Sequence, residues 1–526
     1  MLGARMQFFP PSLKFFAIVV LSLIVRMVPE TQAADSAHTN AGDDDNHRAF
    51  QPSWSSLTNY QCPDWFRDAK FGIWSHWGPQ SVPEGGDWYA RNMYVQGHAA
   101  YQLHLAKFGH PSRVGYKDVI AQWKAERFDA ALADRLMRLY KEAGARYFVS
   151  MGVHHDNFDL WNSKFHKWNS VNMGPRKDIV GIWAEAARKH GLRFGVSEHL
   201  ERSYSWFNTN KRSDTNGPLA GVPYDGNDPK HADFYFPPHD DESMTYPVNP
   251  PEWWMHQWRD RINDLVGSYH PDLLYTDGGI PFGEVGRSVV ANFYNASIQR
   301  NGGKLEAVYT LKQMQWGRKG DHGDYVEGVG VRDMERGFLG KIEPRPWQTD
   351  TSIGDWFYNP KWGYRPAKWV VHMLVDIVSK NGNLLLNVVQ RPDGALDPQA
   401  EELLKDLAAW MRVNGEAIHG TRPWRVFGES EKVAEAGHFK EDVNYSAKDI
   451  RFTTKGETLY AIALGVPQGE VKIASLASVA GKIDSIMLLG TEARLAWKQD
   501  GAALTIQPVA QWPCQHAVVF KIRFNE

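Results

Sequence analysis

The feature that most limits the fold of this chain is an alternation of short apolar runs with helical patterns between residues 70 and 413. Leu132, Leu136 and Leu139, for example, share one face of a predicted helix over residues 131–143. Strands separated by helices pair in parallel, because a parallel connection needs a crossover. The expected strands are 71–74, 147–151, 193–196, 272–275, 307–311 and 384–389. Five or more such units in one domain favour an α/β fold with a (β/α)8-like barrel over an open doubly wound sheet. No G-x-G-x-x-G motif opens the first helix, which argues against a nucleotide-binding sheet.

The pattern changes near residue 420, where helical spacing gives way to short stretches of alternating polarity. Residues 458–463 and 516–522 are examples, and turn residues separate such stretches. This alternation is typical of antiparallel strands with one buried face. We therefore expect a catalytic barrel over residues 51–420 and a C-terminal antiparallel β-sandwich domain over residues 421–526. The sandwich either binds carbohydrate or, as we favour, braces the barrel.

The N-terminal segment has the features of an export signal. Two basic residues precede an apolar run over residues 15–25, and a small-residue stretch ends near Ala33. We expect a signal peptide over residues 1–33 and a disordered, polar leader over residues 34–50. The apolar run is short for a membrane span. We therefore predict an exported protein, periplasmic or extracellular, with no stable membrane insertion; an uncleaved anchor is the alternative.

The net charge of the chain bears on the class of molecule that it binds. A formal net charge of −2 over 526 residues creates no large field that would attract nucleic acid or anionic lipid, so a neutral substrate fits better.

The only cysteines, Cys62 and Cys514, match no zinc motif. Export would permit one disulfide between them. Two unpaired thiols are the interpretation that we favour.

Polar side chains directly follow four of the predicted strands. The segments are Ser75-His76, His154-His155-Asp156, Ser197-Glu198-His199 and Thr276-Asp277. The carboxyl ends of the strands of a parallel barrel meet at one face, which is where such barrels place their chemistry. A single buried histidine is usually an ordinary core residue, but four successive polar strand ends indicate a functional site.

Two chemistries fit these side chains. Histidines and carboxylates can bind a metal, but no H-x-H or H-E-x-x-H spacing is present. Moreover, His154 and His155 would point in opposite directions unless the strand ends or bulges there. The second chemistry is glycosyl transfer to water, which needs one carboxylate at the anomeric carbon and a carboxylic acid for the departing oxygen. Asp277 suits the first role because two glycines follow it, although Asp-Gly-Gly is also a common turn.

Six short segments occur in a fixed order along the chain. They are KFGIWSHWG (70–78), DWYARNMY (87–94), HHDNF (154–158), PDLLYTDGG (271–279), WQT (347–349) and NGNLLLN (381–387). In combination, over about residues 65–421, they closely resemble glycoside hydrolase family 29, the retaining α-L-fucosidases. The resemblance implies a (β/α)8-like barrel with a C-terminal β-sandwich. It also implies the terminal sugar of an oligosaccharide or polysaccharide as substrate, and neither a cofactor nor a metal.

The resemblance assigns roles to individual residues. Asp277 corresponds to the nucleophile that forms a covalent glycosyl-enzyme. The residues implied to bind the terminal sugar, or to pack beside it, are His76, Asp87, Trp88, His154, His155 and Tyr275. We place Glu198 with them because a strand delivers it to the same face. Adjacent neutral imidazoles suit a cis-diol, since each offers one donor and one acceptor.

The resemblance also implies that the general acid/base is a glutamate that precedes Trp347. Glu335 and Glu327 both lie in this region, and the spacing to Trp347 favours Glu335. Glu198 is a third candidate because a rigid strand carries it. The non-functional interpretation of Glu335 and of Glu327 is a solvent-exposed carboxylate in a loop, which is the usual environment of glutamate.

Three departures from the family pattern surround the predicted sugar pocket. Asp87 stands where the family usually has Glu, Ser197-Glu198 replaces Tyr-Tyr, and QMQWG at 313–317 replaces a segment that carries an arginine. These changes give a more polar wall than the methyl group of fucose prefers. We therefore hypothesise that L-galactose, which carries a hydroxyl at that position, is the true or an additional substrate. The sequence is also compatible with a sugar-binding protein without turnover and with a metal-dependent hydrolase.

Overall fold

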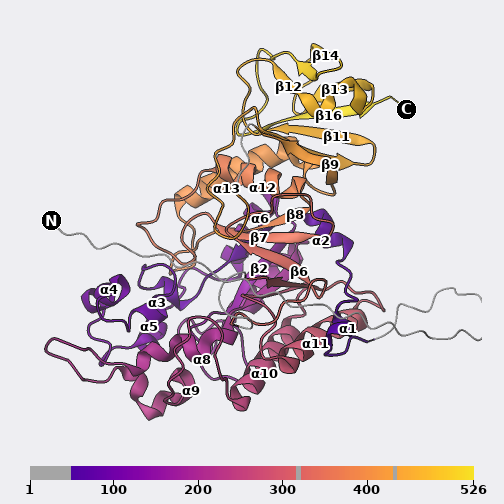
Figure 1. Ribbon diagram of the computed structural model, residues 1–526. Coiled ribbons are helices and arrows are strands. Elements are labelled where there is room, and N and C mark those ends of the chain that lie inside the picture. Colours follow the sequence, from indigo (N-terminus) through magenta and orange to yellow (C-terminus); the bar gives the residue numbers. More distant parts are fainter. Residues whose placement is uncertain (1–48, 315–320, 431–434, 526) are drawn as a thin grey trace, which may run out of the picture. The chain divides into compact units, whose positions relative to one another are not determined.

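Eight parallel strands form a closed barrel in the computed structural model, which describes residues 49–314, 321–430 and 435–525 (Figure 1). The strands are β1 Phe71–Ser75, β2 Tyr147–Val153, β3 Arg193–Glu198, β4 Leu273–Thr276, β5 Val308–Lys312, β6 Val331–Glu335, β7 Trp347–Ser352 and β8 Gly382–Asn387. They pair in chain order, and β8 returns to β1 with Ile73 opposite Leu386. The predicted barrel is therefore confirmed. The predicted signal peptide and most of the leader lie outside the described residues.

Two barrel strands, β6 and β7, are absent from the strands expected from the sequence. Strand β7 has the sequence WQTDTS and β6 has VRDME, so neither contains an apolar run. All six residues of β7 are nevertheless buried. Among the described residues, no helix separates β5 from β6 or β6 from β7. Strands without apolar runs or flanking helices give no periodic signal, and this is why the pattern missed them.

The long helices follow the barrel strands in the usual βα alternation. They are α6 Ala130–Glu142, α7 Ile179–Lys189, α10 Glu252–Tyr269, α11 Glu284–Arg300, α12 Ala367–Ser379 and α13 Pro398–Asn414. Two of these helices, α6 and α7, begin at an aspartate that caps the first turn. The Asp129 carboxylate accepts from the backbone N–H of Leu132, and the Asp178 carboxylate accepts from that of Gly181.

Shorter helices occupy the connections on the carboxyl side of the strands. Between β1 and β2 lie α3 Tyr89–Asn92, α4 Ala99–Lys107 and α5 Tyr116–Gln122, and between β3 and α10 lie α8 Ser203–Trp206 and α9 Ala232–Tyr235. Helices α1 Trp54–Leu57 and α2 Asp64–Ala69 precede the barrel. Trp206, Phe234 and Tyr235 are fully buried, so the β3–α10 connection has an aromatic core of its own.

The C-terminal region consists of two antiparallel sheets, as expected for the predicted sandwich (Figure 1). The five-stranded sheet has the order β13-β16-β11-β10-β9, and the three-stranded sheet has the order β12-β15-β14. The strands are β9 Arg422–Glu429, β10 Ile450–Lys455, β11 Thr458–Ala463, β12 Val471–Ile473, β13 Ile483–Leu488, β14 Trp497–Gln499, β15 Leu504–Ile506 and β16 Val518–Phe524. Helix α12 packs against β9 and β10, where Arg451 forms a buried ion pair of 2.6 Å with Asp376.

Neither cysteine is oxidised, and no described helix could span a membrane. Cys62 and Cys514 are free, half-buried thiols in this structure. In the part of the chain that the structure describes, no helix combines the length and the apolar character that a bilayer crossing requires.

Candidate active site

A cavity of about 450 Å³ opens at the carboxyl ends of the barrel strands. Its volume lies in the usual range for small-molecule sites. Most of the strands contribute to it. The lining includes Trp74, His76, Asp87, Trp88, His154, His155, His199, Arg202, Tyr275, Asp277, Lys312, Glu335, Asp350 and Trp356. The predicted polar strand ends therefore converge at one site.

A bulge at the end of β2 places both histidines of the pair on this cavity. The register between β2 and β3 shifts between Met151 and Val153. His154 and His155 follow this bulge, and both line the cavity with ring centroids 4.4 Å apart. The irregular strand end removes the alternation that would otherwise point one of them away.

Hydrogen bonds fix different tautomers for the two rings. Gln80 accepts from the backbone N–H of Ala90 through Oε1, so its Nε2 donates to His154 Nδ1 over 2.7 Å. His155 Nδ1 instead donates to the carbonyl of His199 over 2.6 Å. Burial lowers the pKa of both rings well below the ordinary value, so they are neutral. His154 thus presents an N–H to the cavity and His155 an acceptor, which matches two adjacent hydroxyls.

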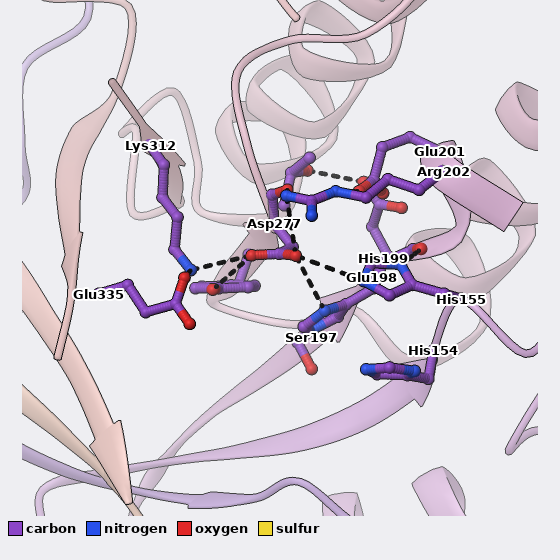
Figure 2. Close-up of polar contacts among 12 residues, drawn as sticks. His154, His155, Ser197, Glu198, His199, Glu201, Arg202, Asp277, Lys312 and Glu335 are labelled. Carbon is purple, nitrogen blue, oxygen red and sulfur yellow. Dashed lines mark hydrogen bonds and ion pairs between the residues drawn. The ribbon is translucent and has the colours of Figure 1, made fainter. Parts of the chain in front are cut away.

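The carboxylate of Asp277 lies between two basic side chains, Lys312 on one side and Arg202 on the other, with the rings of His155 and His199 nearby, as Figure 2 shows. Arg202 Nη2 lies 3.1 Å from Oδ2, and the imidazoles of His155 and His199 lie 3.6 Å from the same oxygen. Burial raises the pKa of this carboxyl. The Arg202 guanidinium and the Lys312 ammonium outweigh burial and hold the pKa well below the ordinary value. Asp277 is therefore an ionised carboxylate.

Lys312, at the end of β5, joins Asp277 to Glu335 (Figure 2). Its ammonium lies 2.8 Å from Asp277 Oδ1, 2.8 Å from Glu335 Oε2 and 3.3 Å from Asp350 Oδ2. Because one nitrogen contacts both, those carboxylate oxygens are at most about 5.6 Å apart. For this pair of oxygens the upper limit agrees with the roughly 5–5.5 Å between the carboxyl groups of retaining glycosidases and lies below the roughly 6.5–9.5 Å of inverting ones. Burial raises the pKa of Glu335 despite the opposing charge of Lys312.

The other predicted sugar-binding residues surround this centre. Asp87 Oδ1 lies 3.7 Å from His154 Nε2, and burial raises the pKa of the Asp87 carboxyl. Trp88 has a left-handed φ of 59° and approaches His155 edge to face. Tyr275 donates to Asp350 over 2.9 Å. His76 is buried, and its Nδ1 has no hydrogen-bond partner among the described residues.

Two predicted glutamates do not line the cavity. Glu198 is fully buried, and its carboxylate accepts from Trp258, Thr276 and the Leu200 backbone. Glu327 is exposed and accepts from Tyr325. Glu335 is the one of the three glutamates considered from the sequence that lines the cavity.

Sequence reasoning missed several residues that contact the two carboxylates. Lys312 directly follows the predicted strand 307–311, so the strand-end signal that identified Asp277 could have found it. His199 belongs to one of the polar strand ends that were expected at the site, but no individual role was assigned to it. Arg202 lies four residues beyond β3, at a position that no periodic pattern marks.

The histidine cluster also has the geometry of a metal site. Ligand atoms of His76, His154 and His199 lie within 4.8 Å of one another, as do those of His155, His199 and Asp277. However, Arg202 and Lys312 already neutralise Asp277, and two buried cations would repel a divalent ion. We therefore expect that dialysis against a strong chelator will leave activity unchanged. Loss of activity that added zinc restores would establish a metal-dependent hydrolase.

Comparisons with known proteins agree over nearly the whole chain. The profile of the alpha-L-fucosidase family matches residues 37–416, and that of the alpha-L-fucosidase C-terminal domain matches residues 443–523. Mouse tissue alpha-L-fucosidase is 29% identical over 470 residues, which cover 86% of this chain and 89% of the mouse protein. Human plasma alpha-L-fucosidase is 28% identical over 488 residues, with 89% and 91% of the two chains covered.

Solved structures give the same result. The crystal structure of Thermotoga maritima alpha-fucosidase in complex with fucose is 26% identical with a TM-score of 0.69, and the match covers 90% of this chain and all of that one. The chain therefore belongs to the alpha-L-fucosidase family, and it is a glycoside hydrolase that acts on terminal α-L-fucosyl residues of glycans.

Proposed function

We propose that the enzyme hydrolyses α-L-fucosides by double displacement with retention, using Asp277 as nucleophile and Glu335 as general acid/base. The observation that carries this proposal is the single ammonium of Lys312, which contacts both carboxylates at 2.8 Å. That separation leaves room for an anomeric carbon between the carboxylates but not for an additional water molecule. The opposite pKa shifts of the two groups match the two roles.

Each step then follows from the positions of these groups. An oxygen of Asp277 bonds to the anomeric carbon while the glycosidic C–O bond breaks, and Glu335 gives its proton to the leaving oxygen. In the second step Glu335 takes a proton from water, the water oxygen bonds to the anomeric carbon, and the ester to Asp277 breaks. Two inversions return the starting configuration.

Lys312 couples the two steps through its charge. In the free enzyme its ammonium contacts the ionised carboxylate of Asp277, the carboxyl of Glu335, which carries the proton for the first step, and Asp350. Esterification removes the charge of Asp277, so the ammonium then acts more strongly on Glu335 and favours its ionised form. Glu335 thereby changes from acid to base between the two steps.

Retention is tested by following the first anomer of fucose released from an aryl α-L-fucoside by proton NMR. We expect the α-anomer to appear first and mutarotation to follow. Initial appearance of the β-anomer would show inversion and exclude a covalent intermediate on Asp277.

L-Galactose is a second candidate substrate, and His199 favours it. Its imidazole lies in the cavity 5.8 Å from the ring of Trp74, and its buried Nε2 has no hydrogen-bond partner among the described residues. A substrate hydroxyl could satisfy this nitrogen, whereas a methyl group could not. Glu198, which first suggested a polar wall, points away from the cavity.

The comparison of kcat/KM for aryl α-L-fucoside and aryl α-L-galactoside tests this second candidate. If the extra hydroxyl binds His199, we expect the two values to lie within about 10-fold of each other. His199→Phe also removes a group 3.6 Å from Asp277, so it should lower both values, and the galactoside value more than the fucoside value. A clear preference of the wild-type enzyme for the fucoside would exclude L-galactose as a true substrate.

We also propose that the protein is exported, with a signal peptide over residues 1–33 and a leader over residues 34–50. The catalytic domain then spans residues 51–420 and the sandwich residues 421–526. The apolar run at 15–25 and the small residues before Ala34 support cleavage at this place. N-terminal sequencing of the secreted protein tests the boundary.

A further inference from the structure

A segment of the C-terminal region reaches the active site and runs beside the end of β6. We call residues 437–441, which lie between β9 and β10, the strap. The strap forms an antiparallel bridge to the barrel, in which the Gly437 N–H donates to the Phe338 carbonyl over 2.9 Å. This approach requires glycine, because a Cβ on Gly337 would overlap the carbonyl oxygen of Gly437. The contact is thus backbone against backbone.

The strap forms hydrogen bonds with both the N–H and the carbonyl of Glu335. The Glu335 N–H donates to His438 Nδ1 over 3.1 Å, and the Glu335 carbonyl accepts from the Phe439 N–H over 3.0 Å. Burial lowers the pKa of His438 to about 4, so the ring is neutral and can accept. Further along, the Glu441 carboxylate accepts from Arg336 over 3.0 Å and contacts Arg365 at 3.5 Å. The strap is therefore anchored directly beside the proposed acid/base.

Phe439 does not contribute to a hydrophobic core despite these anchors. Its ring lines the active-site cavity and is 55% exposed. Its φ of 57° lies in the left-handed region, which is costly for an aromatic residue. Strain of this kind persists where surrounding structure enforces it, and it concentrates at ligand-binding positions. An exposed aromatic ring that is held rigidly at a cavity is a typical binding surface.

We propose that Phe439 forms the wall of the leaving-group subsite, against which the apolar face of the sugar that carries the fucosyl residue packs. This inference rests on the proposed mechanism and extends it. The fucosyl ring occupies the deep part of the cavity near His154, His155 and Asp277, and the glycosidic oxygen must reach Glu335. The group attached to that oxygen then lies beside the residue whose backbone is bonded to Glu335. Met244, 55% exposed, and Met314 extend the same apolar rim.

The test compares Phe439→Ala with the wild type on three substrates. An α-L-fucosyl disaccharide needs the acid and fills the subsite. Methyl α-L-fucoside needs the acid, but its leaving group is too small to reach the ring. α-L-Fucosyl fluoride needs neither acid nor subsite in the first step, so its kcat/KM reports on the attack by Asp277. We expect Phe439→Ala to lower kcat/KM for the disaccharide by about 5- to 30-fold and for the other two by less than about 2-fold. Phe439→Tyr should restore the disaccharide value.

Other outcomes overturn the inference in distinguishable ways. If the disaccharide and methyl fucoside values fall together while fluoride turnover is kept, the strap only positions Glu335 and the ring binds nothing. If all three values fall together, Phe439 has a structural role. Failure of the wild type to hydrolyse the fluoride would instead refute the proposed mechanism. Met487→Ala serves as the matched control, because this side chain is 58% exposed on the C-terminal sheet and lies outside the cavity lining.

Discussion

Asp277→Gly should lower kcat for an aryl α-L-fucoside by about 10⁴-fold or more, the scale expected when an enzymatic nucleophile is removed. The glycine leaves a space beside Arg202 and Lys312, and both cations lose the Asp277 carboxylate, while Lys312 keeps its contacts with Glu335 and Asp350. A small anion should bind there for the same electrostatic reason that holds Asp277 ionised. We therefore expect azide to restore part of the activity and to yield the β-L-fucosyl azide, in which the configuration is inverted. Product analysis by NMR checks this result.

Asp272→Asn is the control for this variant, because Asp272 precedes the same strand at its other end. Its carboxylate pairs with Arg193 and accepts from the Phe194 backbone, so its loss should affect stability and leave kcat within about 2-fold of the wild type. Azide rescue that yields only the α-azide, or a folded Asp277→Gly enzyme with full activity, would contradict the assignment of the nucleophile.

Glu335→Gln should produce the second-largest loss, and its size should depend on the leaving group. For a fucosyl disaccharide, whose leaving oxygen needs a proton, we expect kcat/KM to fall by about 10²–10⁴-fold. For fucosyl fluoride the decrease in kcat/KM should be slight, because fluoride leaves without protonation. The ratio of the two kcat/KM values measures the contribution of the acid.

The pH profile of kcat/KM gives an independent check. The pKa of Asp277 is held low, so the acidic limb should lie below the ordinary range of an aspartate. The pKa of Glu335 is raised, so wild-type activity should fall as the pH rises through that value and the acid loses its proton. Glu335→Gln should abolish this alkaline limb. If Glu327→Gln abolishes the limb and Glu335→Gln does not, the exposed glutamate is the acid/base.

The sequence predicted those parts of the barrel that have a periodic signal. Six strands with apolar runs were placed correctly because each faces packed helices on one side and the barrel interior on the other. Strands β6 and β7 escaped detection because Asp333, Gln348 and Asp350 face a polar barrel interior, where they bond to one another and to Lys312. Such strands are stabilised by hydrogen bonds that no single-sequence pattern shows.

The site was predictable where it follows strand ends and unpredictable where it depends on loops. Asp277, His154 and His155 come directly after strands, and the structure brings them together. Glu198 also ends a strand, but its side chain points away from the cavity because Trp258 and Thr276 supply its donors. Arg202 and Phe439 enter the site from segments whose path depends on tertiary contacts alone. Phe439 comes from the C-terminal region, for which bracing of the barrel was favoured over carbohydrate binding.

The most direct test of the mechanism is to trap the glycosyl-enzyme with a 2-deoxy-2-fluoro fucosyl donor that carries a good leaving group, and to map the labelled peptide by mass spectrometry. The fluorine slows both steps, so the intermediate should accumulate. We predict one fucosyl adduct per chain, attached to Asp277 and released on longer incubation as the enzyme regains activity. An adduct on any other residue, or turnover without an adduct, would contradict the account.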